Sequence, residues 1–267
     1  MTRATIVHAE HGRHIEDAVD RFGDHEGMTQ GHVLKWLLQF EDNDLPLAVK
    51  ILETIMYLNA INIRAMTSAL FDMVVARMAA EGLMRAAFVA VGSAASGSGN
   101  VARALRDALR GSNHVLISML DFANADNGDF DAVVFVDDFS GTGETLSEWW
   151  ENVESVVRPK NAQVFAGLLI VTAAARDQIS DFAEVLAVDE LDVTRNALAD
   201  ESMTFSDEEK VRIRHYCDQT GVDAELRSGY GQCGLLLAFR HGSPDNSLPI
   251  IWANHDNWWP LFRRRAI

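Results

Sequence analysis

The sequence predicts an α/β fold with a mainly parallel sheet flanked by helices, and two observations carry this prediction. From residue 86 onward, short apolar runs alternate with segments of helical pattern. The clearest runs, such as those that begin at Ala86 and Ala132, are continuously apolar, which is typical of strands buried on both faces of a parallel sheet. Strands that alternate with helices indicate βα units, so we expect successive strands to run in the same direction.

The first 85 residues read as helices. The clearest helix begins at Asp44, with Pro46 in its first turn and apolar residues at helical spacing as far as Leu58. We expect residues 1–85 to form an N-terminal helical layer that covers a core or an interface and carries no chemistry.

The central part of the chain contains the predicted βα units. One helix should begin at Asn100, a residue type favoured as an N-cap, and end before Gly111. A second should run from about Thr145 to Val157. The expected strands are 86–92, 114–120, 132–138, 163–172 and 182–188.

The last third of the chain ends in an aromatic tail. A helix over 207–219 is predicted by the capping box formed by Ser206 and Glu209, and a late strand by the run 233–239. Three of the five prolines and three of the six tryptophans follow residue 243. We therefore expect a folded C-terminal hood that joins the sheet in one compact unit, residues 86–267.

Composition limits the kinds of partner. The formal net charge of −16 disfavours broad contact with nucleic acid or an anionic membrane, although backbone amides at a helix N-terminus can still bind a local phosphate. Two cysteines are too few for a disulfide framework, and no apolar run is long enough to span a bilayer. A cytoplasmic protein without direct nucleic-acid or membrane contacts is expected.

The segment VVFVDDFSGTGET, residues 133–145, carries the strongest functional signal. Asp137 and Asp138 follow an apolar strand, at the end where parallel sheets bind ligands. The loop after them leads into a helix, whose unpaired N–H groups suit a phosphate, and its glycines permit close backbone approach. Two carboxylates beside a phosphate favour sugar hydroxyls or Mg²⁺ as their partners.

Two competing phosphate motifs are excluded by the residues present. A P-loop requires a lysine that this loop lacks, and the third glycine of the dinucleotide fingerprint is replaced by Leu146. A tight turn with solvated aspartates is the remaining structural alternative.

A second candidate loop runs from Gly92 to Gly99. It contains only small residues between a strand and a helix, more than a turn requires, so it could cradle an anion or be a loop without a ligand. The candidate binding residues here are Gly92, Ser93, Ser96, Gly97 and Ser98.

The 133–145 segment resembles the phosphoribosyl-pyrophosphate (PRPP) signature of type I phosphoribosyltransferases. The chain as a whole resembles the phosphoribosyltransferase-like proteins of bacterial conflict, or anti-phage, systems. That second resemblance is carried by KWLLQF, FVAVGSAASGSG and SPDNSLPIIW, residues 35–40, 88–99 and 243–252.

The resemblance implies a sheet of the phosphoribosyltransferase type, Mg²⁺ as cofactor, and roles for the residues of both loops. Asp137 and Asp138 would contact the ribose hydroxyls and the metal, while the 92–99 loop would hold pyrophosphate. The 5′-phosphate would be held by the loop residues Thr142, Gly143, Glu144 and Thr145. A defence role, a protein partner from the same operon and a homodimer are compatible with it. One departure is Gly141, which offers no side chain as a base toward an incoming nucleobase.

The hood supplies two further candidates. Trp252 and Asn246 could select the base, by stacking and by hydrogen bonds, or the tail could simply close the core. Three functions stay open: transfer of the phosphoribosyl group at ribose C1, hydrolysis of a nucleotide or N-glycosidic bond, and non-catalytic nucleotide sensing that regulates a partner.

Overall fold

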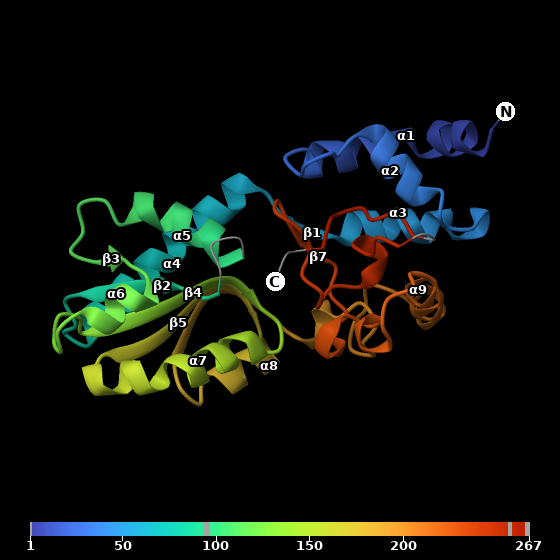
Figure 1. The fold of residues 1–267 in the computed structure, drawn as a ribbon. Coiled ribbons are helices and arrows are strands. Elements are labelled where there is room, and N and C mark those ends of the chain that lie inside the picture. Colours follow the sequence, from blue (N-terminus) through green and yellow to red (C-terminus); the bar gives the residue numbers. More distant parts are fainter. Residues whose placement is uncertain (1, 93–96, 256–257, 265–267) are drawn as a thin grey trace. The chain divides into compact units, whose positions relative to one another are not determined.

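The computed structural model describes residues 2–92, 97–255 and 258–264, which form two compact units (Figure 1). Unit 1 combines Met1–Ala60 with Val193–Ala266, and unit 2 contains Ile61–Asp192. This division differs from the expected one at residue 85. Within the described ranges, no helix has the length and apolar character that crossing a membrane requires.

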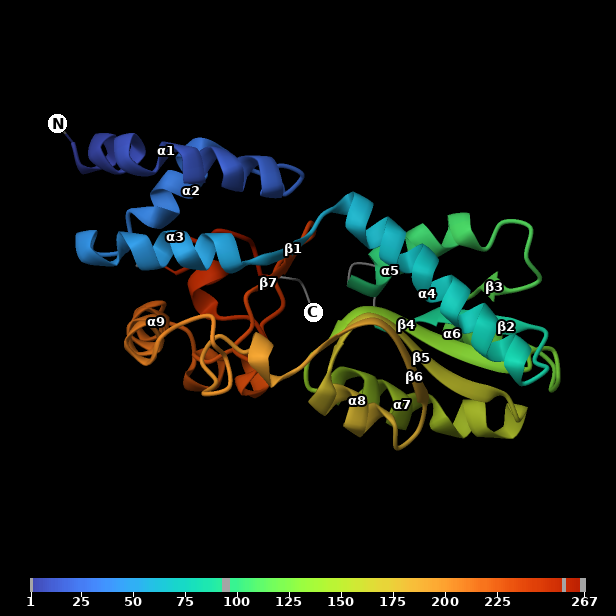
Figure 2. The same cartoon turned by 180° about the vertical axis from the view of Figure 1, so that it is seen from behind.

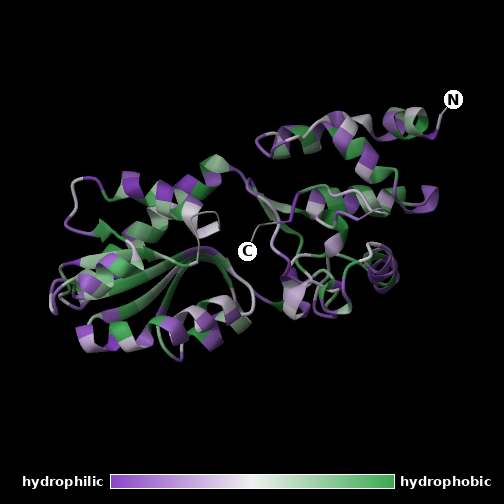
Figure 3. Cartoon of the chain, viewed as in Figure 1, coloured by the Kyte–Doolittle hydropathy of each residue, from purple (hydrophilic) through white to green (hydrophobic). Residues whose placement is uncertain are grey.

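Unit 2 contains a five-stranded sheet in the order β3-β2-β4-β5-β6, and every neighbouring pair is parallel. The α/β class with a mainly parallel sheet is thus confirmed. Figure 3 shows the apolar character of the central strands. The strands are β2 (Ala86–Ala90), β3 (Val115–Leu116), β4 (Ala132–Ser140), β5 (Gln163–Thr172) and β6 (Glu184–Leu191).

Helices cover both faces of this sheet (Figures 1 and 2). The helices α4 and α5 lie on one face, and α7 and α8 on the other. Close packing of α4 is visible at Gly167, where an added Cβ would lie 3.5 Å from Leu70 Cδ2. The helix α4 therefore belongs to the sheet rather than to a separate N-terminal layer. The unit 2 helices are α4 (Ala60–Ala80), α5 (Gly97–Ala108), α6 (Met119–Asn124), α7 (Glu144–Val157) and α8 (Ala173–Ile179).

Two local expectations for unit 2 were wrong. The helix expected from Asn100 begins three residues earlier, at Gly97, so part of the small-residue loop is helical. The strand expected over 114–120 is only Val115–Leu116, because Ser118 and Asp121 form a capping box that starts a short helix.

Unit 1 packs helices from the start of the chain against its last third. Its main elements are α1 (Arg3–Phe22), α2 (Gln30–Leu37), α3 (Leu45–Thr54), β1 (Met56–Leu58), α9 (Asp207–Gln219) and β7 (Leu237–Phe239). The predicted capping box of α9 is present. The helix predicted to reach Leu58 ends at Thr54, because Met56–Leu58 pairs in parallel with Leu237–Phe239. Helical spacing alone did not reveal this distant partner strand.

Two of the stretches singled out in the sequence pack together inside unit 1. The fully buried Trp36 donates its indole N–H to the Ile250 carbonyl oxygen at 2.8 Å, and Trp258 donates to the same oxygen at 3.0 Å. The Gln39 side chain also donates to the Trp259 carbonyl at 2.9 Å. The segments 35–40 and 243–252 are therefore two halves of one core.

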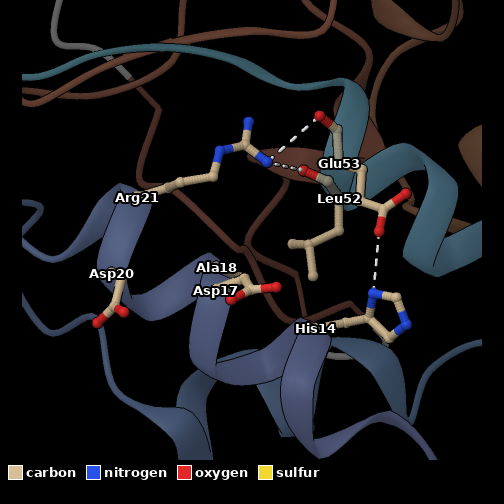
Figure 4. Close-up of a pocket in the computed structure, with 7 residues that line it drawn as sticks. All are labelled: His14, Asp17, Ala18, Asp20, Arg21, Leu52 and Glu53. Carbon is tan, nitrogen blue, oxygen red and sulfur yellow. Dashed lines mark hydrogen bonds and ion pairs between the residues drawn. The ribbon is translucent and has the colours of Figure 1, made fainter.

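A cavity of about 380 Å³ lies between α1 and α3 in unit 1 (Figure 4). The His14 Nδ1 of α1 lies 2.9 Å from the Glu53 carboxylate of α3, so one side-chain hydrogen bond bridges the two helices. Arg21 donates to the Glu53 carbonyl at 3.2 Å and to the Ile55 carbonyl at 2.7 Å. These hydrogen bonds satisfy carbonyl groups that the end of α3 leaves without intrahelical partners. We therefore interpret Arg21 as a residue that holds α1 and α3 together, and the cavity as a gap between the two helices.

Arg21→Ala should therefore lower the free energy of unfolding of unit 1 by about 1 kcal/mol. This is the usual net contribution of a hydrogen bond from a charged group that is still partly in contact with water. Thermal melting with Arg13→Ala as control checks this, because Arg13 is an exposed arginine of the same helix. Equal melting temperatures for the two variants would contradict the capping role.

Candidate functional site

The two aspartates lie within β4, which is buried along its whole length. Asp137 is 6% exposed and Asp138 is fully buried. The strand continues two residues beyond the pair, because Phe139 and Ser140 still pair with β5. Successive side chains of a strand point to opposite faces, so the two carboxylates leave β4 on opposite sides of the sheet. The sequence predicted the pair correctly near the strand's carboxyl end, and the divergence follows from the same strand because the two residues are adjacent in it.

The carboxylate of Asp138 lies against the beginning of α5. A Cβ added to Gly97 would be 2.2 Å from each Asp138 carboxylate oxygen, so only glycine fits here without displacing them. The helix α5 begins at Gly97, and the positive end of its dipole therefore faces this buried negative charge. The two segments that the sequence analysis singled out separately, the 92–99 loop and the strand with the two aspartates, are thus in direct contact at Gly97 and Asp138.

The start of α5 is also tied to the strand before it. The buried Ser98 hydroxyl donates to the Val91 carbonyl at 2.5 Å, and the Val91 N–H donates to Val136 of β4 at 3.1 Å. Gly92 is exposed and has a φ of +77°. Ser93 and Ser96 lie outside the described residues, so their predicted contacts stay predictions.

The loop between β4 and α7 contains a glycine in the left-handed conformation at Gly143. Gly143 has a φ of +87°, and an added Cβ would lie 3.2 Å from the Ala175 carbonyl oxygen. Thr172 donates its hydroxyl to the Gly141 carbonyl at 2.6 Å, which fixes the loop to the end of β5. The loop is therefore shaped by the neighbouring βα corner and by glycine's access to positive φ.

The first two side chains of α7 are exposed, whereas Gly141 and Gly143 before them are buried. Glu144 begins α7 and, like Thr145, is exposed, while Thr142 is half-buried. The Thr142 hydroxyl accepts the Glu144 N–H at 3.4 Å, a weak contact that an incoming anion could replace. The N-terminus of a 14-residue helix, two threonine hydroxyls and a glycine turn together suit a phosphate group.

The two hood candidates lie in unit 1, and both are buried. Trp252 is 3% exposed and donates its indole N–H to the Ser247 carbonyl at 2.8 Å. The Asn246 side chain donates to the Tyr230 carbonyl at 3.1 Å. Their polar groups are thus engaged inside unit 1, which favours the alternative that the tail closes a core over the expectation that it meets a base.

The donor set near β4 suits Mg²⁺ only in part. Across the described ranges, no cluster of three or more histidine, cysteine or acidic side chains has an arrangement suited to a metal ion. The divergence of Asp137 and Asp138 argues against both carboxylates binding one ion from the protein alone. Carboxylate oxygen is nonetheless the right donor, and Mg²⁺ is commonly held by one or two carboxylates together with substrate phosphates.

Comparisons with solved structures give distant similarities. A hypoxanthine-guanine phosphoribosyltransferase of Leishmania tarentolae in complex with GMP is 14% identical, with 52% of this chain and 81% of that chain covered and a TM-score of 0.33. An orotate phosphoribosyltransferase of Aeropyrum pernix is 18% identical, with 39% and 60% covered and a TM-score of 0.27. Comparison with curated proteins gives no match.

The family comparison covers most of the chain. The PRTase-CE family model matches residues 33–264, which include both loops, the aspartate strand and the two packed stretches of unit 1. The match thus spans both compact units rather than the sheet alone. The chain therefore belongs to the PRTase-CE family of phosphoribosyltransferase-like proteins.

Proposed function

We propose that the protein binds PRPP, or a related 5-phosphoribosyl nucleotide, together with Mg²⁺ and reacts at ribose C1. The observation that carries this proposal is the arrangement around β4. The strand with the two aspartates leads into a glycine turn and a helix N-terminus, and Gly97 lies against the Asp138 carboxylate. A ligand with a sugar between two phosphate groups matches this arrangement, because the aspartates can accept hydrogen bonds from the sugar and the helix N-termini can donate hydrogen bonds to the phosphates.

Each part of the ligand would have its own partner. The N–H groups and hydroxyls of Thr142–Thr145 would hold the 5′-phosphate, and residues 92–99, which include the start of α5, would hold pyrophosphate. Asp137 would accept hydrogen bonds from ribose hydroxyls and, with phosphate oxygens, would hold the metal. Bound Mg²⁺ would offset the negative charge of the leaving pyrophosphate.

Transfer would break the bond between C1 and the pyrophosphate oxygen, and the electron pair would leave with the pyrophosphate. Positive charge would develop on the ribose, where a nearby carboxylate stabilises it electrostatically. The acceptor would then supply the electron pair for the new bond to C1. Calorimetry with PRPP and Mg²⁺, followed by product analysis with and without added nucleobases, tests both binding and transfer.

Water as the acceptor is a second candidate, favoured by Gly141. At this position the chain has no side chain that could deprotonate a nucleobase, and the Gly141 carbonyl accepts a hydrogen bond from Thr172. A hydrolase would release ribose 5-phosphate without any added acceptor. Product that forms only when a nucleobase is present would instead identify the transferase.

Asp137→Asn is expected to weaken PRPP binding while leaving the fold intact or slightly more stable, because it relieves repulsion between adjacent charges. The amide oxygen of asparagine can still accept the Asp138 N–H that now donates to Asp137 Oδ1 at 2.8 Å. Calorimetry and melting check this, with Asp181→Asn, an exposed residue near the amino end of β6, as the charge control. Unchanged affinity in both Asp137→Asn and Asp138→Asn would refute the assignment of the pair.

We also propose a role in anti-phage defence, which the sequence resemblance alone suggests. Cells that express the protein and any partner from its operon should resist phage infection, and Asp137→Asn should remove that resistance. Plaque counts on matched strains test this. Equal plaque counts with and without the operon, across a varied set of phages, would contradict the role.

A further inference from the structure

Two histidines lie one helical turn apart on α1 in unit 1. His11 and His14 are both half-buried, and the centres of their rings are 6.1 Å apart. The family match begins at residue 33, so both histidines precede it. Neither has a part in the phosphoribosyl site, and the imidazole of histidine is the commonest metal ligand in proteins.

The distance between the two rings suits a shared metal ion. Zn–N bonds of about 2.0–2.1 Å place each ring centre about 3.2 Å from the ion, so two rings on one ion have centres at most about 6.4 Å apart. At the tetrahedral angle the same bonds give about 5.2 Å. The observed 6.1 Å lies within the limit, and a rotation of either ring about its last side-chain bond would shorten it.

The Glu53 carboxylate of α3 fixes which nitrogen of His14 is left for a ligand. Glu53 Oε1 lies 2.9 Å from His14 Nδ1, and because an ionised carboxylate only accepts hydrogen bonds, the proton is on Nδ1. The lone pair is then on Nε2, which Figure 4 shows on the far side of the ring from Glu53. Metal-binding histidines commonly donate their other ring N–H to a carboxylate, which orients the ring and makes the ligand nitrogen more basic.

The surroundings of His14 are acidic. Glu53 and two aspartates of α1, Asp17 and Asp20, line the adjoining cavity between α1 and α3. The arginine in the same lining, Arg21, is engaged with backbone carbonyls at the end of α3. Three carboxylates against one guanidinium give a negative local charge, which would favour a cation here.

We propose that His11 and His14 bind a divalent transition-metal ion such as Zn²⁺, and that Glu53 is a positioning residue that orients His14. Water would complete the coordination, because the part of the chain that the structure describes has no group of three or more histidine, cysteine or acidic side chains arranged to hold a metal ion. The site needs neither PRPP nor Mg²⁺. Its ligand chemistry also differs from that of the phosphoribosyl site, since imidazole suits Zn²⁺ whereas Mg²⁺ prefers oxygen.

Calorimetric titration of the full chain, without an affinity tag, with ZnCl₂ tests the proposal. His11→Ala and His14→Ala should each weaken zinc binding at least about tenfold, because each removes one of two protein ligands. Alanine favours helix, so α1 should stay folded in both variants, which circular dichroism checks. Excess MgCl₂ should leave the zinc affinity within about twofold, since Mg²⁺ does not compete for imidazole.

Two variants of Glu53 test the positioning role. Glu53→Ala should weaken zinc binding about tenfold, the usual lower limit for loss of a residue that orients a metal ligand. Glu53→Gln should restore most of the affinity, because its amide oxygen can still accept the His14 N–H. An equal loss in the two variants would contradict the positioning role.

Two other histidines provide the matched controls. His8 is exposed one turn before His11 on α1, and His215 is exposed on α9. His8→Ala and His215→Ala should each leave the zinc affinity within about twofold. The proposal is overturned if either control weakens zinc binding as much as His14→Ala does, if excess MgCl₂ displaces the zinc, or if the parent chain binds no zinc.

Discussion

Gly143→Val is expected to lower the affinity for PRPP at least about tenfold, which corresponds to 1.4 kcal/mol of binding free energy. The valine side chain would start 3.1 Å from Gln178 Cβ and 3.2 Å from the Ala175 carbonyl, so the loop would have to move. A φ of +87° is also strongly unfavourable for a β-branched residue. Both effects act at the turn that would present N–H groups to the 5′-phosphate.

The control for this variant is Gly128→Val. Gly128 has a φ of +90°, but an added Cβ would meet nothing within 4 Å. It therefore carries the same kind of backbone strain without the steric conflict and outside the phosphate loop. Calorimetry with PRPP and Mg²⁺, corrected for the folded fraction by melting, should show weakened binding in Gly143→Val only. Equal affinities in the two variants would mean that the loop is not the phosphate cradle.

Trp252→Ala is expected to destabilise unit 1 by about 3–5 kcal/mol, the usual cost of truncating a buried tryptophan. The indole is 3% exposed, belongs to the core shared by the first sixty residues and the tail, and donates to Ser247. Denaturant unfolding measures the loss. Trp252→Phe, which keeps an aromatic ring but removes the N–H, should cost less than Trp252→Ala.

The same variant separates the two interpretations of the tail. A core tryptophan predicts that PRPP and nucleotides bind the remaining folded protein with unchanged relative affinities. A base-selecting tryptophan predicts instead that discrimination among nucleotides changes by about 1–3 kcal/mol, the size of a stacking contact, with stability nearly unchanged. Titration of Trp252→Ala with adenosine and uridine monophosphates under stabilising conditions distinguishes these outcomes.

Local sequence patterns determined many of the individual elements in both units. The continuous apolar runs at 132–138 and 163–172 predicted β4 and β5, because strands buried on both faces require apolar residues at almost every position. The capping box at Ser206 and Glu209 predicted the start of α9 for an equally local reason, since its hydrogen bonds join residues three apart. The glycine at the turn was likewise a local signal, because positive φ is open to glycine itself, whereas its close contact with Ala175 results from packing.

Only the tertiary structure decided which distant segments belong together. Residues 35–40 and 243–252 share a core through Trp36 and the Ile250 carbonyl, and β1 pairs with β7 across about 180 residues, pairings that no local period encodes. The surroundings of the two aspartates in β4 also depend on contacts between distant segments. The sequence placed Asp138 near the end of a strand, but its burial against Gly97 results from how α5 packs on β4. Hydrophobic periodicity specifies which face of a segment is buried, whereas the identity of its partner depends on the packing of the whole chain.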